Sequence, residues 1–120
     1  MITVEAKVVA ALTGSAELMA LLAKGKESVY HNQSKDAGTY PVITYTVTGD
    51  SPHQHFDNHC SAHMAVVRIW IETSNGACSD IRKLVYKAMT AAGFMWHQDA
   101  GGNEDNYFYK AMDFTIAEEV

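Results

Sequence analysis

The sequence gathers its reactive side chains between residues 53 and 63, where four of the six histidines stand beside a cysteine and an aspartate. The members of this cluster are His53, His55, Asp57, His59, Cys60 and His63. Imidazole, thiolate and carboxylate are the ligands that zinc prefers, and four of them close a tetrahedral site. The spacing suits zinc poorly. His53 and His55 lie on the same side only if the segment is extended, whereas His59 and His63 lie on the same side only if it is helical. We expect a solvated loop here, and keep as an alternative a small zinc-binding protein that uses His53, His55, His59 and Cys60.

Catalysis is a second alternative for the same residues. A nucleophilic enzyme needs an activated Ser, Cys or Lys beside a base and an orienting third group. Histidines flank Cys60, but a Cys/His pair that is close only in sequence has little specificity. The chain also contains no G-x-S-x-G, H-E-x-x-H or P-loop motif. We therefore expect no enzyme activity and no cofactor, with a small cytosolic enzyme using Cys60 as nucleophile kept as the remaining rival.

Length and charge predict one acidic domain that assembles with other chains. The sequence has 120 residues, a formal net charge of −5, and only 19% charged residues. This length supports one domain over residues 1–120, and the charged fraction lies below the roughly 25% of an average domain. The acidic balance excludes non-specific binding to nucleic acid, which needs clustered Lys and Arg. No apolar run reaches the ~18 residues of a membrane span, so we expect no membrane partner.

The spacing of apolar residues predicts three helices. The first covers residues 3–12, and a second, short helix begins at Ser15. The third is expected to be capped by Ser74 or Asn75 and to end at Gly93, because glycine favours the backbone conformation that terminates a helix. Its apolar positions repeat at the helical period of 3.6 residues, so one face should pack against a core.

Alternating apolar residues predict the strands, which cover residues 29–30, 42–48, 62–73, 94–98 and 107–116. In the longest of them, Ala65, Val67, Ile69 and Ile71 share one face, and the opposite face is half polar. We expect that second face to meet another layer or another subunit. A break at 49–52 and the polar residues after it predict a mobile loop around 50–61. The order of helices and strands predicts an α+β fold, an antiparallel β-sheet with helices packed on one face.

These segments together resemble the tail completion, or tail-to-head joining, proteins of long-tailed bacteriophages and prophages. The resemblance covers nearly the whole chain and includes no catalytic motif. It is carried by the order of the elements, by Tyr40-Pro41 at the start of a strand, and by the strand around Ile69-Trp70-Ile71 with its following helix. The matching segments are KVVAAL, ELMALL, TYPVITY, MAVVRIWIET, SDIRKLVYKAM and FYKAMDFTIAE.

The resemblance implies a fold similar to the tail terminator proteins and a structural role without catalysis or cofactor. It implies a ring, typically a hexamer, that joins the head connector and stopper proteins to the tail tube at the head–tail interface of the virion. Assembly would take place in the cytoplasm of the host bacterium. DNA would pass through the channel without specific binding, and an acidic ring would let it slide.

The resemblance also gives the predicted loop a place, near the channel or a neighbouring ring. The residues placed there are His53, Gln54, His55, Phe56, Asp57 and Asn58. The histidine content of this loop departs from the family pattern. Since histidine titrates near neutral pH, protonation would change the charge mainly in the segment expected to face the channel.

Overall fold

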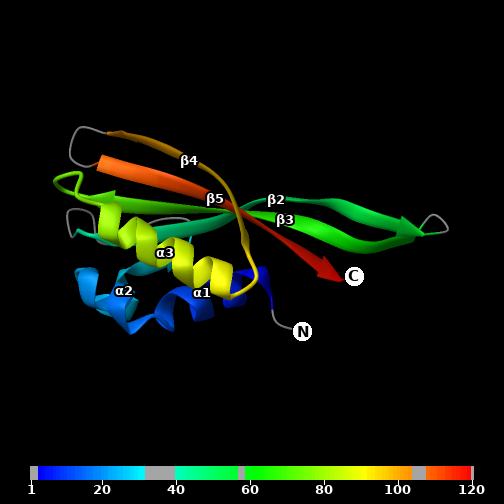
Figure 1. The fold of residues 1–120 in the computed structure, drawn as a ribbon, viewed down its shortest axis with the longest axis horizontal. Coiled ribbons are helices and arrows are strands. Elements are labelled where there is room, and N and C mark those ends of the chain that lie inside the picture. Colours follow the sequence, from blue (N-terminus) through cyan, green and yellow to red (C-terminus); the bar gives the residue numbers. More distant parts are fainter. Residues whose placement is uncertain (1–2, 32–39, 57–58, 104–107, 120) are drawn as a thin grey trace.

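The computed structural model places helices on one face of a five-stranded sheet (Figure 1). It describes residues 3–31, 40–56, 59–103 and 108–119, with the backbone alone described at 49–56, 59–63, 103 and 118–119. None of the helices in these ranges has the length and hydropathy of a membrane-spanning helix.

The two N-terminal helices begin where the sequence predicts. They are α1 (Val4–Thr13) and α2 (Ala16–Leu21), and a short 3-10 helix, η1 (Gly25–Ser28), follows them. The side chains of Thr3 and Ser15 each accept a hydrogen bond from the backbone N–H three residues on, at 3.1 and 3.3 Å. These bonds satisfy N–H groups that have no partner within the helix, and so fix both starting points.

Helix α3 (Ser79–Ala91) starts later than expected. The prediction of a cap at Ser74 or Asn75 is wrong, because the Asn75 side chain accepts a hydrogen bond from the N–H two residues on, at 2.9 Å, and makes a turn instead. Cys78 occupies the cap position without a side-chain bond. The predicted end is confirmed, since Gly93 follows the helix with a φ of 97°, a conformation that glycine adopts easily.

The sheet has the order β1-β2-β3-β5-β4. Its strands are β1 (Val29–His31), β2 (Val42–Phe56), β3 (His59–Thr73), β4 (Met95–Asn103) and β5 (Phe108–Glu119). The α+β class is confirmed, with one difference: β1 pairs parallel to β2, whereas the other three pairings are antiparallel. Strand β4 also continues to Asn103, beyond the predicted end at residue 98.

The segment predicted as a loop around 50–61 continues the two central strands instead. The break expected at 49–52 is wrong, because β2 passes through Gly49 and Pro52 in register with β3, with shifts after Val47 and around Gln54. Such bulges absorb residues that fit a regular strand poorly, and proline is tolerated where no neighbouring strand needs its N–H. We call residues 50–56 and 59–61 the arm; Figure 1 shows it projecting from one end of a molecule of 52 × 28 × 23 Å.

The core lies between the helices and one face of the sheet. The predicted inner face of β3 is confirmed, because Ala65, Val67, Ile69 and Ile71 are all buried. The helices, β2 and β5 supply most of the remaining large side chains, which include Val8, Leu12, Leu18, Ile43, Ile81, Val85, Met89, Met112 and Phe114. Phe108 is in phase with Met112 and Phe114 along β5, but it lies at the start of the strand and is 44% exposed.

Candidate assembly surfaces

The predicted site residues that the structure describes lie in the arm. His53, Gln54, His55 and Phe56 end β2, and His59 and Cys60 begin β3. The register makes His55 the partner of Cys60, and Phe56 the partner of His59. Asp57, Asn58 and the side chains of the arm fall outside the described residues. The zinc alternative therefore gains no support, and the side chains that are described include no group of three His, Cys, Asp or Glu residues able to hold a metal ion.

The face of the sheet turned away from the helices is open in the described part of the chain (Figure 1). Register places Val66, Arg68, Trp70 and Glu72 of β3 on this open face, since their neighbours in sequence point into the core. All four are half-buried. The mixed polar and apolar character predicted for this face is thus present, on a surface that no described helix covers.

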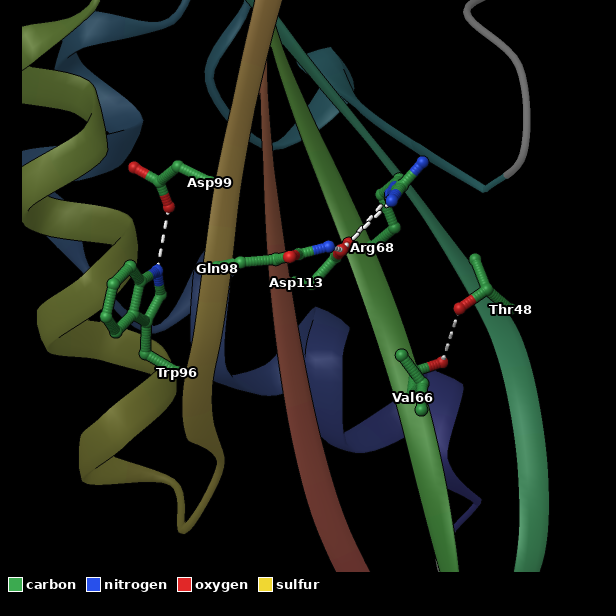
Figure 2. Close-up of polar contacts among 7 residues, drawn as sticks. All are labelled: Thr48, Val66, Arg68, Trp96, Gln98, Asp99 and Asp113. Carbon is green, nitrogen blue, oxygen red and sulfur yellow. Dashed lines mark hydrogen bonds and ion pairs between the residues drawn. The ribbon is translucent and has the colours of Figure 1, made fainter.

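A charged pair organises the centre of the open face. The Arg68 guanidinium donates two hydrogen bonds to the Asp113 carboxylate, at 2.7 and 2.9 Å, and the Gln98 amide donates a third at 2.9 Å (Figure 2). The Asp113 side chain is only 8% exposed. The hydrogen bonds from Arg68 lower the pKa of Asp113, and the bond from Gln98 lowers it further. Burial raises this pKa, but its effect is smaller, so the pKa lies below its ordinary value. Three neighbouring strands, β3, β5 and β4, are thereby tied together.

A second acid on the same face, Glu72, has a less favourable environment for its charged form than Asp113 has. Glu72 accepts a hydrogen bond from the Thr44 hydroxyl at 3.0 Å. Burial raises the pKa of Glu72, and the bond from Thr44 offsets only part of that effect. Beside it, the Arg68 guanidinium lies 5.9 Å from the ring centre of Trp70. The described part of the open face thus holds one ion pair and one acid bound to a hydroxyl group, with an aromatic ring beside them.

The β4 edge carries two of the three large apolar side chains that are exposed on the described sheet, the third being Phe108 of β5. Met95 is 69% exposed and Trp96 is 43% exposed. The Trp96 indole N–H donates to Asp99 at 2.7 Å, and Asp99 also pairs with Arg82 of α3 at 2.6 Å (Figure 2 shows the Trp96–Asp99 bond). Trp96 therefore has a fixed orientation at the surface, although its ring is not sealed from solvent. Fixed, partly exposed aromatic side chains are typical of protein interfaces.

The helical side of the molecule presents a different surface. A shallow groove of about 360 Å³ lies between α1 and α3, bordered by small residues that include Ala11, Gly14, Ala88 and Ala91. The described chain therefore offers two unlike surfaces, an apolar groove among the helices and an open sheet with a charged centre.

Sequence reasoning missed both ion pairs. Arg68 belongs to the half-polar second face of its strand, but its partner Asp113 stands 45 residues away. The available signal was Asp113 itself, an acid between the apolar residues Met112 and Phe114 in the middle of a strand. A buried acid in such a place needs a partner, and register alone decides which one.

The fold thus combines an extended arm with a sheet that helices cover on one face. The family model for tail completion protein gp17 matches residues 6–104, and the chain belongs to this family. The resemblance found in the sequence is thereby confirmed. Family membership makes the chain a structural protein of the phage tail or head–tail region.

Solved structures support the same fold. A chain in the virion of a native gene transfer agent (GTA) particle has a TM-score of 0.66 at 14% identity, covering 98% of this chain and 95% of that one. The gp17 protein of bacteriophage SPP1 has a TM-score of 0.50 at 15% identity, covering 97% and 90%. No curated protein sequence matches the chain. The tail-completion-like α+β fold is therefore confirmed.

Proposed function

We propose that six copies of the chain form a closed ring at the head–tail interface of the virion, between the head connector or stopper protein and the tail tube. The observation that carries this proposal is the contrast between the faces of the sheet. Helices seal one side, while the other side is open and ends at an edge with exposed Met95 and Trp96. In a ring, the open face can line the channel, and each subunit needs two unlike contact surfaces to meet its two neighbours.

The charge of the chain fits passage of DNA through this ring. Each copy has a formal net charge of −5. A negative channel repels the duplex and lets it slide, whereas a basic channel would hold it. Assembly in the cytoplasm of the host bacterium, before incorporation into the virion, belongs to the same proposal.

The arm supplies the contact beyond the ring. It projects away from the helix-covered body (Figure 1). We assign the tip, from His53 to Asn58, to the channel or to the neighbouring protein. A hairpin of this kind contributes little to the core of its own subunit, so its sequence is free to be shaped by a partner.

Light scattering tests the ring directly. The purified chain is measured alone and with the adjoining connector, and we expect the connector to recruit six chains. Exchanging Met95 for serine should reduce recruitment without unfolding the chain, because its side chain is largely exposed. Lys83→Ser, on the exposed side of α3, is the matched control and should behave like the wild type. A chain that stays monomeric and unbound beside the connector contradicts the proposal.

A further inference from the structure

We propose that the ring closes by β-strand pairing between copies: the outer edge of β2, from Thr46 into the arm, pairs with the outer edge of β4 in the next copy. This inference rests on the proposed ring and names the surface that closes it. The result is one continuous sheet around the channel, with the helices outside and the open face inside.

The two edges are the unpaired sides of a single sheet. Strand β1 pairs only with residues 43–45 of β2, so the described part of the chain leaves the outer side of β2 unpaired from Thr46 to Phe56. In the same described ranges, β4 pairs with β5 on one side and with no strand on the other. Backbone N–H and C=O groups along such edges are satisfied best by another strand.

The β4 edge is only lightly protected against pairing. Natural edge strands are protected by lysine, proline, β-bulges or inward-pointing charges. Strand β4 contains no lysine or proline, and its register shift lies near its start, between Trp96 and Gln98. Its one charged residue, Asp99, is already bound to Arg82 and Trp96 on the helix side. Exposed side chains flank the strand on both faces, since register aligns Met95 with the open face while Trp96 lies against Tyr86 of α3. A docking strand would cover the backbone and both side chains.

Strand direction suits a second copy of this chain. The pairings β2–β3, β3–β5 and β5–β4 are all antiparallel, so β4 runs opposite to β2. When a second copy is generated by rotation about an axis that runs roughly along the strands, its strands keep the same directions as those of the first copy. It therefore presents its β4 antiparallel to the β2 edge, and the two unlike edges make the head-to-tail contact from which rings are built.

The stagger between the edges also fits a closed barrel. Within one copy, the register across the sheet places Asn103, the last residue of β4, at the same height along the strands as the start of β2. The outer edge of β2 is already paired with β1 as far as Tyr45. The neighbouring β4 must therefore shift along the strands by about five residues, or roughly 17 Å. Four strand spacings per copy amount to roughly 19 Å across the sheet. Together these steps tilt the strands by about 40°, within the ~35–45° that closed barrels adopt.

Cysteine cross-linking in assembled particles tests the pairing. In a background with Cys60→Ser and Cys78→Ala, one chain carries Thr48→Cys on the β2 edge and Ala100→Cys on the β4 edge. A short bismaleimide should give a ladder of covalent multimers up to the full ring. Each single variant should stay monomeric on a denaturing gel, as should the control pair Thr48→Cys with Lys83→Cys. A second pair in the same antiparallel register, Val47→Cys with Gly101→Cys, guards against a local defect, because both positions lie on the helix side of the sheet and a side chain at Gly101 meets only ordinary contacts.

The outcomes separate this inference from the ring itself. Particles that contain the chain but give no ladder from either edge pair overturn the strand pairing and leave the ring in place. Dimers from Thr48→Cys alone also overturn it, because they show like edges meeting. Absence of the wild-type chain from particles overturns the ring, and the strand pairing with it.

Discussion

The body and the arm of this molecule are built from the same two strands but are stabilised differently. In the body, β2 and β3 lie under three helices, and their inner residues are fully buried. In the arm, the same strands continue past the helices as a ribbon (Figure 1). Burial of apolar surface is the main force that stabilises a fold. The body should therefore determine stability, which leaves the arm free to serve assembly.

The largest effect on stability is expected from the centre of the body. Phe114 is fully buried against the helices. Truncation in Phe114→Ala removes this packing and leaves a cavity, and should lower the free energy of unfolding by about 3–5 kcal/mol. Urea unfolding measures the change. Phe108→Ala, at an exposed ring of the same strand, is the control and should cost less than about 1 kcal/mol. Equal losses from the two variants would contradict the placement of the core.

A smaller effect is expected at the charged centre of the open face. Arg68→Ala leaves the buried Asp113 carboxylate with only the Gln98 hydrogen bond, which should cost about 2 kcal/mol near pH 7. Because the pKa of Asp113 is lowered in the folded chain, its stabilisation is present above the ordinary carboxyl pKa and is lost as the pH falls through the lowered value.

Unfolding measured against pH checks this sign. The difference between wild type and Arg68→Ala should shrink below about pH 4. The double variant Arg68→Ala with Asp113→Asn should remove this part of the pH dependence. A wild-type-to-variant difference that grows on acidification would show that the pair does not stabilise the fold.

The contrast between body and arm also explains what the sequence predicted well. Helix starts at Thr3 and Ser15 and the inner face of β3 follow from local chemistry and short periodicity, which sequence displays directly. The arm was interpreted as a loop because Gly49 and Pro52 disfavour regular strands. Pairing with β3 and bulges override that local preference.

Contacts between distant residues were the harder part of the site. The Arg68–Asp113 pair depends on the order β3-β5 in the sheet, and residue spacing does not encode strand order. The parallel pairing of β1 is hidden for the same reason, since three residues carry too little pattern to fix a partner. The aromatic edge at Trp96 was recognisable as an interface type, but its fixed orientation needed the positions of Asp99 and α3.

The smallest effect on stability and the largest on assembly should come from the tip of the arm. A chain that lacks Gln54–Asn58 keeps every described core contact, so its unfolding midpoint should match the wild type. Replacing the same five residues with Gly and Ser is the control that keeps the length and removes the side chains. This control shows whether assembly depends on the length of the arm or on the side chains at its tip.

The most direct test of this division of roles is electron microscopy of particles made with the chain that lacks Gln54–Asn58, alongside its unfolding curve. We predict a normally folded chain and a field of separate heads and tails. Intact, joined particles would contradict the assembly role of the arm, and an unfolded chain would contradict the independence of the body.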